Sequence, residues 1–483
     1  MASDSSTKKV KVCVVGAGLA GLAAARELRR EGHDVAVLEQ RGGVGGQWLY
    51  EEDTAIDGTD PLGVAGVQSS VYASLRLITP REAMGFSDFP FRPSARGADG
   101  DARRFPCHAE FLRYIRDFCD AFGLMDVVRL NTRVLRVAMA PSVSSRDGWL
   151  RWTVRSKHGE VETEEVFDAV VVAVGHYSQP RLPTIDGMDR WRRRQLHCHS
   201  YRVPDSFHGE VVVVVGCSIS GNDIALELHR VAKEVHLSAK SPEEALATPT
   251  MSKMLSRHDN LHLRPRIVRL CEDGTVVFAD GTRVVADAVV YCTGYSYTYP
   301  FLDMGGHVTV DDNRVGPLFE HVFPPSLAPT LSFVGIPAKV VVPLFYETQA
   351  RWVAQVLSGR RALPSPEEML RAAEEYVRGR EAAGVAKRHT HDIFDLDYCD
   401  DYGDRTCGFP RLEAWKKELV WSSVFAMRDD VEAFRDDFRD SDLVADGLRR
   451  HGWIPLAPSQ PPQPEDDDGN KLEGVPAMAA RLS

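Results

Sequence analysis

A glycine-rich turn between a β-branched run and an amphipathic segment constrains this sequence more than any other feature. The turn spans residues 16–21. It follows the apolar run 11–15 and opens the Ala-, Leu- and Arg-rich segment 19–31, and a second apolar run follows at 34–39. Strand, turn, helix and strand in this order form a βαβ unit, whose parallel strands are buried on both faces and therefore read as continuous apolar runs. The sequence thus begins with a predicted Rossmann-like dinucleotide-binding domain.

Each residue type in this turn suits a bound dinucleotide. Gly16 allows a tight turn, Gly18 lets backbone N–H groups approach a pyrophosphate, and Gly21 lets helix and strand pack closely. The helix N-terminus adds its dipole and its free N–H groups. A carboxylate at Glu39 would accept hydrogen bonds from a ribose 2′-hydroxyl and repel a 2′-phosphate, so the site favours FAD or NAD over NADP. The candidate residues are Gly16, Ala17, Gly18, Leu19, Ala20, Gly21, Glu39, Gln47 and Trp48.

The same pattern returns in the middle of the chain. The valine run 211–215 precedes a turn at 216–221, a helical segment at 222–232 and the next predicted strand at 234–238. Serines replace glycine in this turn, which keeps the residues small and adds hydroxyl donors for phosphate. No acid ends the last run; a lysine stands near the ribose position, as a 2′-phosphate would require. This unit is predicted to bind NADP(H) through Gly216, Cys217, Ser218, Ile219, Ser220, Gly221 and Lys240.

Two similar strand endings, 167–175 and 286–294, stand where the chain would cross between the two nucleotide units. We therefore expect an α/β fold with two Rossmann-like dinucleotide-binding domains, in which the NADP domain is inserted in the FAD domain. The expected limits are 1–180 for the first part of the FAD domain, 181–290 for the NADP domain, 291–456 for the second part with a C-terminal helical region, and 457–483 for a tail. The tail is rich in Pro and acid and is predicted to be disordered.

Composition excludes several classes of protein. A net charge of -11 argues against a general nucleic-acid binder, which needs a basic face. The nine cysteines are dispersed without a C-x-x-C pair, as in a reduced intracellular protein. No signal-peptide segment precedes the first apolar run, and no run approaches the roughly 20 apolar residues of a membrane helix. We expect a cytoplasmic protein without a membrane anchor.

One nucleotide site with an acid and one with a base predict electron transfer from NADPH to a bound flavin. A disulfide reductase would need a redox-active cysteine pair beside the flavin, and residues 42–104 contain no cysteine. Oxygen is therefore the expected electron acceptor. A serine hydrolase built on Ser218 is disfavoured, because Ser220 stands where a nucleophile elbow requires glycine.

With these features the chain resembles the flavin-containing monooxygenases, and in particular the plant branch similar to glucosinolate or thioether S-oxygenases. The likeness runs from Val12 to about Val424. Besides the two turns, its marks are Gly45-Gly46-Gln47-Trp48, Tyr72-Ala73-Ser74-Leu75, Pro80-Arg81-Glu82-Ala83-Met84-Gly85-Phe86, Asp88-Phe89-Pro90, His197-Cys198-His199-Ser200-Tyr201-Arg202, Thr293-Gly294-Tyr295 and Glu347-x-Gln349-Ala350-Arg351-Trp352.

The resemblance implies an enzyme that depends on NADPH and oxygen. In that family NADPH reduces FAD, oxygen adds to give a C4a-hydroperoxyflavin, and a small soft nucleophile attacks its distal oxygen. Because the flavin carries the chemistry, the protein positions the reactants and excludes water, so no catalytic side chain and no metal are assigned. A thioether sulfur is the expected target. Amine N-oxygenation, Baeyer–Villiger attack on a ketone, and an uncoupled NADPH oxidase or nucleotide-binding protein stay open as alternatives.

The sequence departs from the family pattern at two positions. Arg193 stands where the family's identity motif usually has glycine, and a solvated basic loop is expected there. Ile78 stands at the family's usual Asn, which lies close to the flavin's reacting edge; isoleucine offers none of the hydrogen bonds of an amide. We therefore expect more uncoupling to peroxide than is usual in the family. Elsewhere, His389 and His391 are expected to be surface or capping residues rather than metal ligands.

Overall fold

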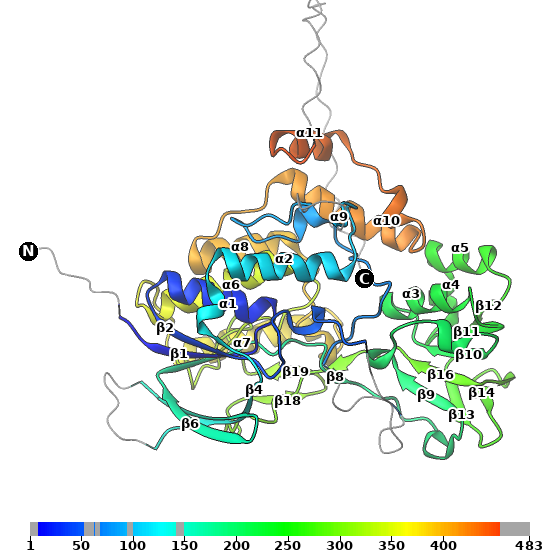
Figure 1. The fold of residues 1–483 in the computed structure, drawn as a ribbon, viewed down its shortest axis with the longest axis horizontal. Helices are drawn as coiled ribbons and strands as arrows, with labels where there is room; N and C mark the ends of the chain where they lie inside the picture. The colour runs from blue at the N-terminus through cyan, green and yellow to red at the C-terminus, as the bar shows by residue number, and fades with distance from the viewer. Residues whose placement is uncertain (1–7, 53–61, 63–67, 94–99, 142–148, 455–483) are drawn as a thin grey trace, which may run out of the picture.

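Two five-stranded parallel sheets form the framework of the chain (Figure 1). This computed structural model describes residues 8–52, 62, 68–93, 100–141 and 149–454. The acidic tail predicted at 457–483 lies outside the described residues. Each sheet contains one of the two βαβ units that the sequence predicts, so each provides a separate nucleotide-binding framework.

The first sheet has the strand order β20-β7-β1-β2-β3. Its central strand β1 (Lys11–Val15) pairs in parallel with β2 (Asp34–Leu38) on one side and with β7 (Ala169–Val172) on the other. The outer strands are β3 (Val128–Arg129) and β20 (Leu331–Phe333). The β-branched residues of β1 are almost completely buried, as expected for a parallel strand covered on both faces.

The second sheet has the order β12-β11-β10-β16-β9 and is built in the same way. The valine strand β10 (Val211–Val215) lies between β11 (Glu234–Ser238) and β16 (Ala288–Tyr291), with β12 (Leu261–Arg264) and β9 (Arg194–His197) outside them. All five strands lie between β7 and β20 of the first sheet in sequence. The predicted insertion of one domain in the other is thereby confirmed, whereas the domain limits given above stay a prediction.

The two chain crossings between the domains lie side by side. Strand β8 (Gln179–Pro180) pairs antiparallel with β17 (Tyr295–Ser296). Arg181 strengthens this ribbon, because its N–H donates to the carbonyl of Gly294 at 2.9 Å and its guanidinium donates to the carbonyl of Thr293. This short ribbon is thus the covalent hinge between the nucleotide domains.

Helices cover both sheets and connect them. Helix α1 (Leu19–Arg30) packs between the first sheet and α6 (Val342–Leu357), and α9 (Ala414–Asp429) packs against α5 (Pro249–Arg257) of the second domain. Figure 1 shows α9 and α10 (Phe434–Asp437) running from above the first domain to the second. The remaining helices are α2 (His108–Ala121), α3 (Ile219–Leu228), α4 (Pro242–Leu246), α7 (Pro366–Ala382), α8 (Leu396–Cys407) and α11 (Asp442–Arg450).

Short antiparallel sheets complete the described fold. They consist of β4 (Thr132–Met139), β5 (Trp152–His158) and β6 (Val161–Phe167) beside the first sheet, β13 (Ile267–Leu270), β14 (Thr275–Phe278) and β15 (Arg283–Val285) beside the second, and the pair β18 (Thr309–Asp311) and β19 (Arg314–Gly316).

The structure places two side chains that the sequence analysis singled out. Arg193 is exposed, as expected of a solvated loop; it pairs with Asp287 at 2.7 Å and lies against Gly274. The surface prediction is wrong for His391, which is buried and lies with its Nδ1 3.0 Å from Nδ1 of His321. Burial lowers the pKa of His391 to about 4, so this imidazole is neutral.

A buried ion-pair network joins α1, the loop at 86–90 and α6. Arg26 on α1 pairs with Glu347 on α6 at 2.8 Å and with Asp88 at 2.7 Å. The Glu347 carboxylate also accepts hydrogen bonds from the backbone N–H and the hydroxyl of Ser87. Because Arg26 and Glu347 are buried, loss of one partner leaves the other charge without full compensation.

We expect Glu347→Gln to lower the free energy of unfolding by about 3 kcal/mol, because the amide removes a buried negative charge and faces the Ser87 donors. The check is urea unfolding followed by circular dichroism. Asp186→Asn is the matched control: it breaks the exposed pair with Arg269 and should cost less than about 1 kcal/mol. Equal costs for the two variants would contradict the structural role of the network.

Candidate dinucleotide sites

The first glycine turn has two positions, Gly16 and Gly21, at which the structure leaves no room for a Cβ. Gly16 has a φ of +102°, and a Cβ there would lie 2.6 Å from the carbonyl oxygen of Ala173 at the end of β7. A Cβ on Gly21 would overlap the carbonyl oxygen of Gly16 itself. Helix α1 begins at Leu19, and no described side chain caps it. The N–H groups of its first turn are therefore available to a bound anion.

Glu39 is fixed against this turn. It directly follows β2 and is buried, with its Oε2 accepting a hydrogen bond from the N–H of Ala17 at 2.7 Å. Its Oε1 accepts from the N–H of Arg41 at 2.9 Å. The sequence indicated a carboxylate at the ribose position but not this bond to the turn. Glu39 therefore orients the glycine turn.

The segment 45–48 lies directly against the first turn. The N–H of Gly45 donates to the carbonyl of Ala17 at 3.0 Å, and a Cβ on Gly46 would lie 2.9 Å from Cα of Gly18. Gln47 is half-buried, and its carbonyl accepts a hydrogen bond from Ser69. The half-buried ring of Trp48 packs edge-on against Phe111 at 4.8 Å. Gly18 and Gly46 therefore pack backbone against backbone, which only residues without side chains permit.

The second turn repeats the geometry of the first. Gly216 has a φ of +107°, and its N–H donates to the carbonyl of Ser238, as that of Gly16 does to Leu38. A Cβ on Gly221 would overlap the carbonyl oxygen of Gly216. Cys217 is half-buried, Ser218, Ile219 and Ser220 are exposed, and no described side chain caps α3. This turn too fits a pyrophosphate.

Two cations lie near the ends of neighbouring strands of the second sheet. Lys240 is exposed and lies two residues beyond β11. Arg264, at the end of β12, is the register partner of Ser238, and its carbonyl accepts a hydrogen bond from the N–H of Ala239. The sequence analysis missed Arg264, because residues 261–264, Leu-His-Leu-Arg, do not form an apolar run that would indicate a strand. Two cations thus lie at or just beyond the ends of the neighbouring strands β11 and β12.

Ile78 lies between the two domains. It is half-buried and packs against the hydrophobic core of the second domain, together with Leu75. The segment is held by Tyr72, whose hydroxyl donates to Asp223 of α3 at 3.0 Å, and by Arg435, which donates to the carbonyl of Leu77 and pairs with Asp223. Ile78 is therefore held at the domain boundary.

Aromatic and thiol groups gather beside the hinge. The ring of Tyr295 lies 5.3 Å from that of His197 and 5.6 Å from that of His199. Cys198 and Cys292 follow the neighbouring strands β9 and β16. The hydrogen bond from Cys292, together with His197, lowers the pKa of the Cys198 thiol to about 5. Sequence spacing alone does not bring these two cysteines together.

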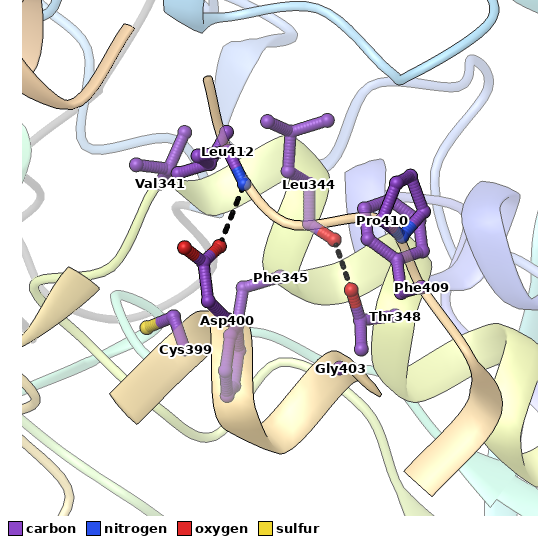
Figure 2. Close-up of a pocket in the computed structure, with 10 residues that line it drawn as sticks. All are labelled: Val341, Leu344, Phe345, Thr348, Cys399, Asp400, Gly403, Phe409, Pro410 and Leu412. Atoms are coloured by element: carbon purple, nitrogen blue, oxygen red, sulfur yellow. Dashed lines mark hydrogen bonds between the residues drawn. The ribbon is translucent and has the colours of Figure 1, made fainter. Parts of the chain in front are cut away.

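The cavity shown in Figure 2 lies between α6, α8 and the segment after α8. Its volume is about 20 Å³, which suits a single water molecule. Its polar walls are already bonded: Asp400 accepts a hydrogen bond from the N–H of Leu412, and Thr348 donates to the carbonyl of Leu344. This cavity is therefore too small to be a substrate site.

Comparison with known proteins agrees with the geometry of the two turns. The family model for flavin-binding monooxygenase-like proteins matches residues 8–254 and 256–413. The chain belongs to this family. It is therefore a flavin-containing monooxygenase, an oxidoreductase.

Individual relatives span the same region of this flavin-containing monooxygenase. The chain is 52% identical over 456 residues to flavin-containing monooxygenase FMO GS-OX-like 9 of Arabidopsis thaliana, covering 92% of this chain and 96% of the relative. It is 54% identical over 444 residues to FMO GS-OX-like 8 of the same plant, covering 91% and 94%. The solved structure of S-allyl-L-cysteine S-oxygenase from Allium sativum has 42% identity and a TM-score of 0.82, covering 93% of this chain and 100% of that chain. Among the helices that the structure describes, none combines the length and apolar character that a membrane span needs.

Proposed function

We propose that this monooxygenase uses FAD, NADPH and oxygen to oxygenate a soft nucleophile, with a thioether sulfur as its main target. The observation that carries the proposal is the pair of glycine turns of similar geometry, one bonded to the carboxylate of Glu39 and the other followed by a strand, β11, with Lys240 two residues beyond it. The similarity to an S-oxygenase over almost the whole chain supports sulfur as the atom that is oxygenated.

The chain's own residues have binding and positioning roles in this proposal. The turn at 16–21 would hold the FAD pyrophosphate, and Glu39 would accept hydrogen bonds from its ribose. The turn at 216–221 would hold the NADP pyrophosphate, with Lys240 and Arg264 near the 2′-phosphate. The bound flavin would supply the redox and oxygen chemistry.

A coupled assay tests the proposal. The purified protein with bound FAD is mixed in air with NADPH and with either small alkyl thioethers or tertiary amines, and sulfoxide, N-oxide and peroxide are measured in the same samples. The expected result is sulfoxide formed in proportion to NADPH consumed. N-oxide in place of sulfoxide would favour the amine alternative, and peroxide alone with every substrate would favour an uncoupled NADPH oxidase.

We expect Lys240→Ala to raise the KM for NADPH by about tenfold, because one charge-assisted contact to the 2′-phosphate is lost. The KM for NADH, which has no 2′-phosphate, should stay unchanged. Initial rates with both coenzymes check this, and Lys233→Ala, a change of another lysine of the same domain just before β11, is the control. An equal rise in KM for both coenzymes would show that Lys240 does not bind the 2′-phosphate.

We expect Ile78→Asn to lower the peroxide formed per NADPH by at least about twofold, because the amide adds hydrogen bonds that isoleucine cannot make. The measurement compares peroxide with NADPH consumption in the presence of a thioether that the wild type oxygenates. Ile78→Val, which keeps an apolar side chain, should leave the ratio as it is. An unchanged ratio in Ile78→Asn would end the hypothesis that Ile78 causes uncoupling.

A further inference from the structure

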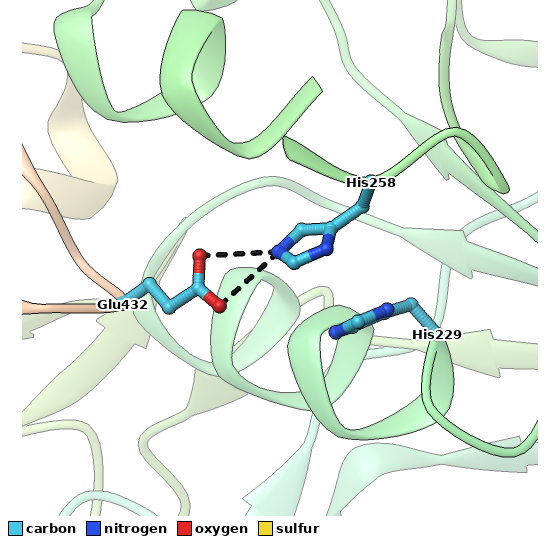
Figure 3. Close-up of side chains that lie close together, drawn as sticks. All are labelled: His229, His258 and Glu432. Atoms are coloured by element: carbon cyan, nitrogen blue, oxygen red, sulfur yellow. Dashed lines mark hydrogen bonds and ion pairs between the residues drawn. The ribbon is translucent and has the colours of Figure 1, made fainter. Parts of the chain in front are cut away.

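Two imidazoles and a carboxylate meet where the second domain contacts the C-terminal segment (Figure 3). His229 directly follows α3, His258 directly follows α5, and Glu432 lies between α9 and α10. One ligand atom from each residue lies within 4.8 Å of the others. All three side chains are half-buried, so an ion could enter from solvent while the site stays held by the fold.

One nitrogen of this cluster is buried without a hydrogen bond. His258 Nε2 lies 3.1 Å from both carboxylate oxygens of Glu432, whereas His229 Nε2 has no hydrogen-bond partner among the described residues. Figure 3 shows the His229 ring pointing toward the same space as the other two side chains. A buried polar atom without a partner is rare in a folded protein and requires an explanation.

The ion pairs around the cluster leave the Glu432 carboxylate free to turn to a cation. Arg257 pairs with Glu432 at 3.3 Å but also with Asp430 at 2.6 Å. It can therefore keep Asp430 as a partner when the Glu432 carboxylate turns to a cation.

We propose that His229, His258 and Glu432 form a zinc site that fastens the C-terminal segment to the NADP domain. Two imidazole nitrogens and one carboxylate oxygen are a ligand set that suits Zn²⁺, with water in the fourth position, whereas Mg²⁺ and Ca²⁺ prefer oxygen ligands only. Tetrahedral zinc places its ligand atoms roughly 3.3–3.6 Å apart, so small rotations of half-buried side chains close the site. The His258 ring proton moves from Nε2 to Nδ1 when Nε2 binds the ion.

A zinc ion at this site would connect the C-terminal segment to the NADP domain. Arg435, three residues beyond Glu432, pairs with Asp223 of the second domain and binds the carbonyl of Leu77 in the first. A zinc ion at Glu432 would fix this segment at its other end as well. Binding should therefore stabilise the packing of the two domains, and its readouts do not depend on which substrate the enzyme oxygenates.

The test measures zinc binding to the full-length protein with its FAD, purified without a polyhistidine tag and dialysed against a chelator. Zn²⁺ is titrated in competition with a chromophoric chelator, and thermal unfolding is followed with and without Zn²⁺. We expect one zinc ion per chain and a higher unfolding temperature. His229→Gln should weaken binding by at least about tenfold and abolish the zinc-dependent rise in unfolding temperature.

His229→Gln is the decisive variant, because His229 Nε2 has no hydrogen bond to lose. Without zinc the variant loses the ring contact with His258, at 3.9 Å between centroids, and should unfold close to the wild-type temperature. His262→Gln is the control: it alters a second cluster of the same residue types, Glu234, His236 and His262, and should leave zinc binding intact. Binding that survives in His229→Gln, or that is lost in His262→Gln instead, would overturn the proposal. So would wild-type protein that takes up no zinc.

Discussion

Gly21→Ala is expected to yield a protein that folds but is purified without FAD. The new Cβ would overlap the carbonyl oxygen of Gly16; because the backbone alone fixes the position of a Cβ and the oxygen is a backbone atom, no side-chain rotation removes the clash. Either α1 or the turn at 16–21 must shift by about 1 Å, and a misplacement of that size can cost about 100-fold in a positioned site. The N–H groups that would hold the pyrophosphate move with it.

The flavin spectrum and the FAD content per chain measure this effect. Gly379→Ala is the matched control, because it also adds a methyl group to a helical glycine, in α7, where the new Cβ meets no described atom within 4 Å. It should retain FAD. Circular dichroism of Gly21→Ala separates loss of cofactor from loss of fold. Full FAD occupancy in a folded Gly21→Ala protein would mean that the first turn does not hold the flavin nucleotide.

The sequence was sufficient to predict the frameworks of both nucleotide sites. The strand at 11–15 was predicted with the limits that β1 has, and the predicted helix 19–31 differs from α1 by one residue. These elements follow from local rules: continuous apolar strands, a turn of small residues, and an amphipathic helix. The second helix is less well predicted. It was placed at 222–232 but spans Ile219–Leu228, because the serines of its turn hid its true start and residues 229–232 form a turn.

The side-chain networks could not be predicted in the same way. Arg26 and Glu347 are paired although more than 300 residues separate them, and only the packing of α1 on α6 brings them together. The cluster of His229, His258 and Glu432 likewise needs the C-terminal segment to lie on the second domain. For Glu39 the sequence predicted only part of its contacts. Its position after the strand predicted a ribose contact, but its hydrogen bond from Ala17 depends on the turn geometry, which the sequence does not give.

A substitution in the second turn is a stricter test, because disruption of the second turn leaves the first site intact. Gly221→Ala would place a Cβ onto the carbonyl oxygen of Gly216, as Gly21→Ala does in the first turn. We expect the protein to keep its FAD and to bind NADPH about 100-fold more weakly, since the N-terminus of α3 is displaced from the pyrophosphate. The flavin then stays oxidised when NADPH is added at the concentrations that reduce the wild type.

Anaerobic mixing with NADPH, followed by flavin absorbance, measures this loss directly. Dithionite, which reduces flavin without a nucleotide site, should reduce Gly221→Ala and the wild type equally. If NADPH reduces the flavin of Gly221→Ala normally, the turn at 216–221 does not bind NADPH, and the proposal based on the two similar turns is wrong. Gly221 lies in the second domain, and the substitution leaves the first turn unchanged. Loss of FAD from Gly221→Ala would therefore show that the two domains do not bind their nucleotides independently.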